Sequence, residues 1–179
     1  MYDALVLAGG AARRLGGVDK PALVVGGSTL LDRVLSACAD AGRTVVVGPE
    51  RGTARPVIWT REEPVGGGPV PALLAGLREV TADRVVLLAA DLPFLTADVV
   101  RLLVDGAPAV LTDGGRPQWL CGAWPTEALR AAAAQPVDDG RLGTLLSRVG
   151  PRQLDWEGPG APWTDCDTAE DLDEARQRA

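Results

Sequence analysis

The chain of 179 residues contains no histidine, a single lysine and only three cysteines. Without histidine, a Ser-His-Asp triad and a metal site built on imidazole are both excluded. Cys38, Cys121 and Cys166 are widely spaced, odd in number and form no CxxC pair, so neither a disulfide framework nor a zinc knuckle is expected. We therefore expect a reduced, cytoplasmic protein.

Membrane and nucleic-acid partners are not expected either. No apolar run reaches the length of a membrane span, and the first residues lack the basic start of a signal peptide. Acidic residues outnumber basic ones by 24 to 18, which gives a net charge of −6. Because nucleic-acid binding is driven by phosphate neutralisation, this balance argues against a protein that coats nucleic acid. A small basic pocket for a nucleotide is still compatible with it.

The length and composition, with 46% hydrophobic and 23% charged residues, predict one globular domain over 1–179. Continuous apolar segments alternate with amphipathic ones, which predicts an α/β fold with a mostly parallel twisted sheet and helices on both faces. The expected strands are 2–8, 44–47, 56–59, 84–90, 109–111, 117–124 and 152–156. The expected helices are 28–41, 70–81, 96–104, 126–134, 141–148 and one that begins at Thr168 within a capping-box pattern.

A glycine-rich loop follows the first strand and ends at Lys20. It is not a Walker A loop, since no GK[ST] occurs, and it is not GxGxxG. Glycines let backbone N–H groups approach an anion, and Arg14 and Lys20 supply positive charge. Lys20 is also the one lysine beside seventeen arginines, which suggests a position that needs a compact ammonium group. The loop is therefore predicted to hold phosphates, the alternative being a turn with surface arginines.

Carboxylates at two places could bind a hard cation. Asp91 follows an apolar strand and precedes Leu-Pro-Phe, so it is expected to be a metal ligand at the carboxyl end of a strand. Asp165 and Asp167 alternate before the last helix; one of them is expected to be a second ligand, unless Asp167 only caps that helix. The donors are oxygens, so Mg²⁺ or Mn²⁺ is expected and zinc is not.

The ordered residues Leu7-Ala8-Gly9-Gly10, Arg14-Leu15-Gly16 and Lys20, with the later Asp91-Leu92-Pro93-Phe94, resemble the molybdenum cofactor guanylyltransferases. The resemblance covers nearly the whole chain. It implies a single nucleotidyltransferase domain of the Rossmann-like, nucleotide-diphospho-sugar transferase type. It also implies transfer of GMP from GTP to molybdopterin, with release of pyrophosphate. Contacts with proteins that deliver or accept the cofactor would be transient.

Site residues follow from the same resemblance. Arg14, Lys20 and Asp91 would be catalytic, and Asp91 and Asp167 would bind Mg²⁺. The nucleotide would be bound by Leu7, Ala8, Gly9, Gly10, Arg14, Lys20, Glu62, Gly68 and Asp91. Glu62 is the preferred acceptor for guanine, with Glu63 as the alternative. Trp119 to Pro125 resembles a stretch near the second substrate, and the closing motif carries Asp165 and Asp167 where the family has asparagines.

Two other classes of function compete with this interpretation. Molybdenum cofactor cytidylyltransferases tend to read Leu-Ala-Ala-Gly and Gly-Asp-Gln-Pro, whereas Gly9 and Ala90-Asp91-Leu92-Pro93 favour the guanylyl branch. Sugar-phosphate and phospholactate nucleotidyltransferases share the fold and the reaction type. The second class is a nucleotide-binding module without catalysis, which would release no pyrophosphate from GTP.

Overall fold

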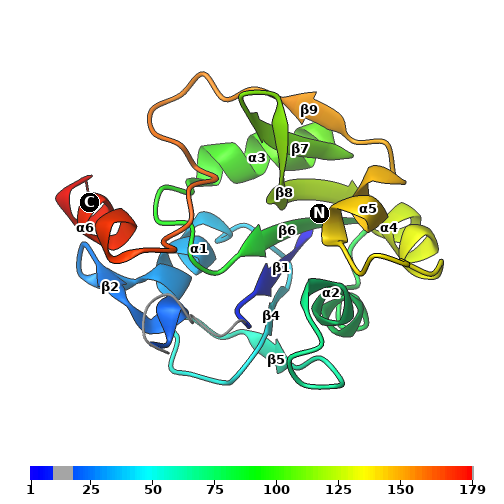
Figure 1. Ribbon diagram of the computed structural model, residues 1–179, viewed down its shortest axis with the longest axis horizontal. Helices are drawn as coiled ribbons and strands as arrows, with labels where there is room; N and C mark the ends of the chain where they lie inside the picture. Colours follow the sequence, from blue (N-terminus) through cyan, green and yellow to red (C-terminus); the bar gives the residue numbers. More distant parts are fainter. Residues whose placement is uncertain (10–17, 179) are drawn as a thin grey trace.

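A computed structural model describes residues 1–9 and 18–178 of the chain. Its main sheet has seven strands in the order β5-β4-β1-β6-β8-β7-β9. Among the described strands of this sheet, β8 alone runs antiparallel to the rest (Figure 1). The strands are β1 (Asp3–Leu7), β4 (Thr44–Val47), β5 (Ile58–Thr60), β6 (Arg84–Ala89), β7 (Ala109–Asp113), β8 (Arg116–Pro125) and β9 (Arg152–Leu154).

Helices cover both faces of the sheet, as expected from its continuous apolar strands (Figure 1). Along β1, Ala4 and Val6 pack into the core beneath α1 (Leu30–Ala37) and α3 (Ala97–Gly106). Leu5 and Leu7 point to the other face, which is covered by α2 (Pro69–Leu77), α4 (Thr126–Ala133) and α5 (Leu142–Ser147). The alternation follows from the two-residue period of a strand. The predicted α/β class is confirmed.

The expected helix over 28–41 is too long at both ends. Ser28–Thr29 (β3) instead pairs antiparallel with Val24–Val25 (β2), and α1 ends at Ala37. The turn between these two short strands has positive φ at Gly26 and Gly27, which explains why glycine occupies both positions. Thr29 caps α1, because its side chain accepts a hydrogen bond from Asp32 N at 3.0 Å.

The C-terminal helix α6 (Ala169–Arg178) lies against this hairpin, although the two are far apart in sequence (Figure 1). Leu172 and Ala175 of α6 are buried in a small cluster with Val25, Leu30 and Cys166. This satellite core fixes the segment that precedes α6 beside the carboxyl end of the sheet. Of the helices in the described residues, none is both long and apolar enough to cross a bilayer.

The carboxyl ends of β1, β4 and β6 lie at one edge of the sheet, since Leu7 pairs with both Val47 and Ala89. The backbones are close together there. A Cβ atom on Gly48, which has φ of 150°, would lie 2.8 Å from the carbonyl carbon and oxygen of Ala8. Glycine at this position therefore lets the loop after β4 approach the loop after β1.

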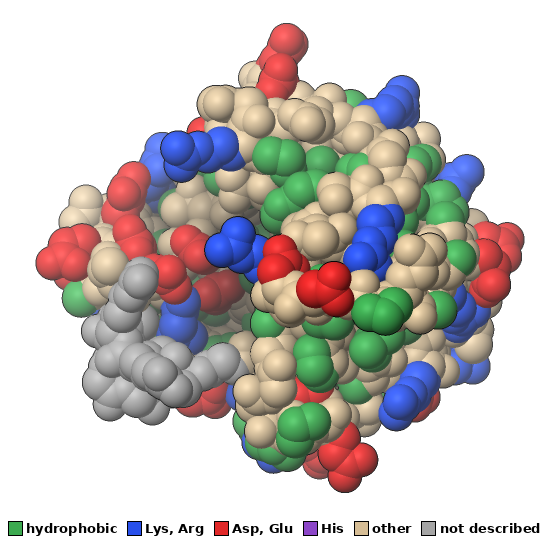
Figure 2. Space-filling model, turned by 45° about the vertical axis from the view of Figure 1, so that its right-hand side comes forward, with side chains coloured by type: hydrophobic (Ala, Val, Ile, Leu, Met, Phe, Trp, Pro, Cys, Tyr) green, Lys and Arg blue, Asp and Glu red, His purple; other side chains and the backbone are tan. Residues whose placement is uncertain are grey.

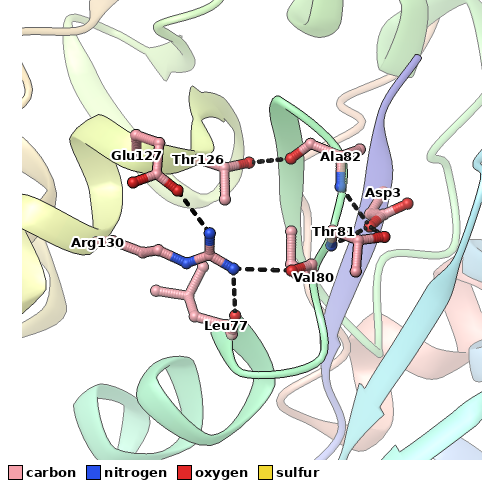
Figure 3. A network of polar contacts seen from close by, with 8 residues as sticks. All are labelled: Asp3, Leu77, Val80, Thr81, Ala82, Thr126, Glu127 and Arg130. Carbon is pink, nitrogen blue, oxygen red and sulfur yellow. Dashed lines mark hydrogen bonds and ion pairs between the residues drawn. The ribbon is translucent and has the colours of Figure 1, made fainter.

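At the opposite end of β1, the buried Asp3 carboxylate holds the preceding loops together (Figure 3). It accepts hydrogen bonds from the backbone N–H groups of Arg43 (2.9 Å), Thr81 (2.7 Å) and Ala82 (3.0 Å). In the same network Thr126 Oγ1 donates to the carbonyl of Ala82 at 2.6 Å. These contacts align the strands whose other ends carry the site.

Replacing this carboxylate should destabilise the fold. Asp3→Ala removes the buried acceptor that three backbone N–H groups share, so the free energy of unfolding should fall by about 3 kcal/mol. Urea unfolding monitored by circular dichroism measures it. Asp105→Ala, an exposed aspartate on α3, should change little. Similar losses in both variants would show that the Asp3 network does not stabilise the sheet.

Candidate active site

Lys20 lies between two carboxylates that come from distant parts of the chain. Its Nζ atom is 2.7 Å from Asp91 Oδ2 and 2.6 Å from Asp167 Oδ1. The Lys20 side chain is only 14% exposed. Burial by itself would lower the pKa of Lys20, but the hydrogen bonds to Asp167 and Asp91 outweigh it and leave the pKa above its usual value. The ammonium is therefore charged at neutral pH, and three predicted site residues meet at one point.

The position of Asp91 is fixed by the end of β6 and by hydrogen bonds from Arg33. Ala90 continues the sheet contact, donating its N–H to the carbonyl of Leu7 at 3.1 Å. Beyond Asp91 the chain turns away at Pro93, whose carbonyl accepts from Arg33 Nε at 3.0 Å. Arg33 also donates to the carbonyl of Val25 at 3.1 Å. It therefore links the Asp91 loop to the hairpin that follows Lys20.

Asp167 does not cap the last helix, so the capping alternative from the sequence is wrong. Thr168 Oγ1 accepts from Asp171 N at 3.2 Å, and the Asp171 carboxylate accepts from the N–H groups of Thr168 (2.7 Å) and Asp167 (3.0 Å). This reciprocal pattern is a capping box. Because Thr168 and Asp171 satisfy the helix terminus, the Asp167 carboxylate can contact Lys20.

A pocket of about 750 Å³ opens beside this cluster at the carboxyl ends of the strands. Acidic side chains gather beside a hollow on the face shown in Figure 2. The pocket is lined by Leu7, Gly9, Pro49, Arg61, Glu62, Val65, Gly66, Gly68, Pro69, Ala72, Ala89, Asp91, Leu120 and Asp165. Five of these are predicted nucleotide-binding residues. Ala8 is buried and is not among the lining residues, and the predictions for Gly10 and Arg14 lie outside the described residues.

The structure distinguishes two neighbouring glutamates that sequence reasoning left as alternatives. Glu62 is 8% exposed and lines the pocket, while Glu63 is exposed. Glu62 Oε1 accepts from Gly66 N at 3.0 Å. Its Oε2 atom is buried and has no hydrogen-bond partner among the described residues. An unpaired buried carboxylate oxygen is costly, so this atom is suited to accept a hydrogen bond from a ligand.

A second pocket, of about 330 Å³, adjoins the first and shares Pro69, Ala89, Leu120 and Asp165 with it. Its remaining lining is mostly apolar and aromatic: Leu92, Pro117, Gln118, Trp119, Cys121, Leu142, Gly143 and Trp163. A Cβ atom on Gly143 would lie 2.9 Å from Trp119 Cδ1, so this glycine makes room for the indole ring. Sequence reasoning did not identify Trp163. The feature that could have indicated Trp163 is its residue type, since aromatic residues make up only 4% of the chain.

Asp165 lies at the junction of the two pockets. Burial, followed by the negative charges of Asp167 and Asp91, raises the pKa of Asp165 above its usual value, although Lys20 opposes this. The charged form of Asp165 is therefore electrostatically unfavourable here unless a cation is close by. The pair Asp165–Asp167 is thus divided: Asp167 contacts Lys20 and Asp165 faces the pockets.

The donor set fits a hard divalent cation. Asp91 Oδ2 and Asp167 Oδ1 already converge on a single positive charge, the Lys20 ammonium. Carboxylate oxygens are preferred ligands of such ions. Within residues 1–9 and 18–178, no three acidic or cysteine side chains gather as a complete metal site. A cation at Asp91 and Asp167 would therefore draw its other ligands from substrate oxygens and water, as Mg²⁺ commonly does.

The chain is similar to known nucleotidyltransferases in sequence and in fold. The family described as the MobA-like NTP transferase domain matches residues 4–153. A molybdenum cofactor guanylyltransferase of Bradyrhizobium sp. (strain ORS 278) is 34% identical over 195 residues, covering 98% of this chain and 92% of that protein.

Two solved structures have the same fold. A nucleotidyl transferase from Methanothermobacter superposes with a TM-score of 0.79 at 21% identity, covering 99% of this chain and 97% of the other. Molybdopterin-guanine dinucleotide biosynthesis protein A from Archaeoglobus fulgidus gives a TM-score of 0.74 at 18% identity, with 98% and 97% covered. At these identities the superpositions support the fold alone.

Removing the central cation should destabilise the folded state. Lys20→Met keeps the length of the side chain but leaves Asp91 and Asp167 without the ammonium between them. The free energy of unfolding at pH 7 should fall by about 1–3 kcal/mol, more than for an exposed ion pair. Urea unfolding measures it. Arg101→Met, which breaks the exposed pair with Asp98, should have no measurable effect. If the two variants behaved alike, the cluster would not stabilise the fold.

Proposed function

Because the chain belongs to the MobA-like NTP transferase family, we propose that it transfers GMP from GTP to molybdopterin, which forms the guanine dinucleotide cofactor and pyrophosphate. Nucleotidyltransferases of this kind generally use a divalent metal ion. One observation carries the proposal. One pocket contains a buried carboxylate oxygen of Glu62 that has no partner among residues 1–9 and 18–178, and at the border of this pocket Asp91 holds the Lys20 ammonium.

The base would lie against Glu62. Guanine offers an N1–H and a 2-amino group as neighbouring donors, and Glu62 Oε2 is an acceptor without a described partner. The adjacent wall is the start of α2, where Pro69 and Pro71 occupy the first turn and carry no N–H. This helix end therefore favours a base or ribose over a phosphate. The triphosphate would therefore lie on the other side of the pocket, toward Lys20.

Phosphates would be held by Lys20 and, from outside the described residues, by Arg14. Asp91 and Asp167 would hold Mg²⁺ or Mn²⁺, which would supply positive charge at the phosphate oxygens. Lys20 can then exchange a carboxylate contact for a phosphate contact without leaving the site. Its role is to hold the triphosphate and to offset the charge that develops on the leaving pyrophosphate.

The acceptor would occupy the smaller pocket, where Trp119 and Trp163 provide surfaces for a flat pterin ring. Its terminal phosphate oxygen attacks the α-phosphorus of GTP in line, and the bond to the β-phosphate oxygen breaks. A phosphate monoester dianion is already nucleophilic near neutral pH. No general base is needed, and the chain has no histidine to supply one. Catalysis is then positioning and charge neutralisation.

We further propose that 1–179 acts as one nucleotidyltransferase domain. The family match ends at residue 153, yet Asp167 contacts Lys20 and α6 packs on the hairpin beyond it. The C-terminal segment is thus an integral part of the site. Three other expectations stay predictions. They are transient contacts with proteins that deliver or accept the cofactor, a cytoplasmic location, and the lack of nucleic-acid or membrane partners.

Pyrophosphate release from GTP in the presence of molybdopterin and Mg²⁺ tests the proposal directly. Release that depends on both substrates supports guanylyl transfer. Equal release with CTP would support a cytidylyl enzyme, and transfer to a sugar phosphate or phospholactate instead would support those related enzymes. Binding of GTP with no release under any of these conditions would support a non-catalytic module.

Substitution of Glu62 should change the choice of nucleotide. Glu62→Gln turns an acceptor into a group that can present an N–H to the donors of guanine. We expect kcat/KM for GTP to fall by about 10- to 100-fold, since hydrogen bonds to charged groups contribute about 1.5–3 kcal/mol. Competition between GTP and CTP measures the change in preference.

The neighbouring Glu63 is the matched control, because it is exposed and does not line the pocket. Glu63→Gln should keep the preference for GTP. If Glu62→Gln left the preference unchanged while Glu63→Gln lowered it, the base would be recognised by the other carboxylate.

The two metal ligands should differ in sensitivity. Asp91→Asn should lower GMP transfer by about 10²–10³-fold with the fold intact, because it removes a charged metal ligand and so weakens the cation that neutralises the phosphates. Asp167→Asn introduces the residue that the family carries there, so activity should persist at a higher Mg²⁺ requirement. Magnesium titrations of both variants measure this. Activity surviving in Asp91→Asn would place the metal elsewhere, and full inactivation by Asp167→Asn would make its charge essential.

A further inference from the structure

Arg51, on the loop between β4 and β5, forms a two-pronged ion pair with the residue that precedes Lys20. Its Nε and Nη2 atoms donate to the two carboxylate oxygens of Asp19 at 3.0 and 2.9 Å. The guanidinium also lies 5.8 Å from the centre of the Trp59 ring on β5. The Arg51 side chain is 12% exposed, so both its position and its orientation are fixed.

Stability alone is a poor explanation for this pair. Asp19 is 51% exposed, and an ion pair with one exposed partner contributes little to folding. Arg51 Nη1 is also buried without a hydrogen-bond partner among the described residues, which costs free energy. Arg51 is therefore a largely buried arginine with one nitrogen that lacks a partner in the described part of the chain, and its clearest effect is the fixed position of Asp19.

Asp19 is in turn the residue from which Lys20 is placed. The short 3-10 helix η2 (Lys20–Ala22) begins directly after it, and Asp19 makes no side-chain hydrogen bond that caps this helix. Its carboxylate is instead directed to Arg51. The pairing also neutralises a negative charge next to the position proposed for the triphosphate. Without Arg51, Asp19 would repel phosphate and would be free to compete for the Lys20 ammonium.

We propose that Arg51 is a positioning residue for nucleotidyl transfer: by clamping Asp19 it fixes Lys20 in the place from which Lys20 holds the GTP phosphates. The inference rests on the proposed function, because Lys20 is assigned its phosphate role there. The Arg51 side chain lines neither pocket and contacts Asp19, so it acts on Lys20 through that residue. Its planar two-pronged contact is specific to arginine, since a lysine cannot donate to both carboxylate oxygens with the same geometry.

The same loop provides a matched control. Arg55 lies four residues further on and donates to the carbonyls of Leu35 (2.9 Å) and Ala39 (3.3 Å), so it anchors the loop to α1 and its C-terminal end. Both of these side-chain contacts are with α1 and the turn that follows it, and neither involves Asp19. Arg55→Met removes an arginine of the same loop and should affect stability, but not the position of Lys20.

The test compares Arg51→Met, Arg51→Lys, Asp19→Ala, the double variant Asp19→Ala/Arg51→Met, and Arg55→Met in the full chain. GTP affinity is measured by calorimetry with Mg²⁺, kcat and KM by pyrophosphate release, and melting temperature by circular dichroism. We expect Arg51→Met and Asp19→Ala each to lower kcat/KM by about tenfold or more, as misplacement of a catalytic group does. Arg51→Lys should recover only part of this loss, and Arg55→Met should stay within about twofold of wild type.

The double variant gives the decisive comparison. If Arg51 acts through Asp19, the double variant should lose no more than the worse single variant. Losses that multiply to about a hundredfold would overturn the proposal, because the two residues would act independently. It would also be overturned if Arg51→Met lowered the melting temperature while kcat/KM and GTP affinity stayed within about twofold of wild type. A wild-type chain that neither binds GTP nor releases pyrophosphate would instead refute the proposed function.

Discussion

The site depends on one largely buried positive charge placed between two negative ones. Lys20 joins the loop after β1, the end of β6 and the segment before α6, because its ammonium contacts both Asp91 and Asp167. Without that charge the two carboxylates would repel each other, and the C-terminal segment would lose its polar tie to the sheet. The same arrangement prepares the site for a polyanion with a cation: Lys20 can exchange a carboxylate for a phosphate oxygen, and the released carboxylate can bind a metal ion, without large reorganisation.

Most of the fold could be predicted from the sequence, because buried strands and amphipathic helices leave distinct periodicities. The expected strand over 84–90 corresponds to β6, and Asp91 follows it as predicted. The exceptions have a physical cause. Strands of two residues, such as Val24–Val25 and Ser28–Thr29, are too short to show alternation, and only Gly26-Gly27 indicates their turn. The helix expected over 28–41 therefore includes Ser28 and Thr29, which belong to this hairpin.

The site itself is less predictable, because contacts between residues far apart in the sequence decide which candidate residues form it. Glu62 and Glu63 are chemically identical in the sequence, yet one is buried by its contact with Gly66 N and the other is exposed. Likewise, Asp167 was equally consistent with a helix cap until Thr168 and Asp171 were seen to satisfy the helix terminus. Arg51 gave no signal at all, since its partner lies 32 residues away in the chain. Local patterns identify candidates, but the packing of loops decides among them.

The charge balance of the site explains why an acidic chain can bind a polyanion. Among the described residues, Glu62, Asp91, Asp165 and Asp167 are the carboxylates that face the pockets or Lys20. Lys20, with Arg61 in the lining of the larger pocket, offsets only part of their charge, and burial together with the neighbouring carboxylates raises the pKa of Asp165. A triphosphate added to this surface would be repelled unless it arrived with a counter-ion. A divalent cation resolves the conflict, because it is attracted by the carboxylates and by the phosphates at once. The acidity that would exclude a bare nucleotide therefore selects its metal complex.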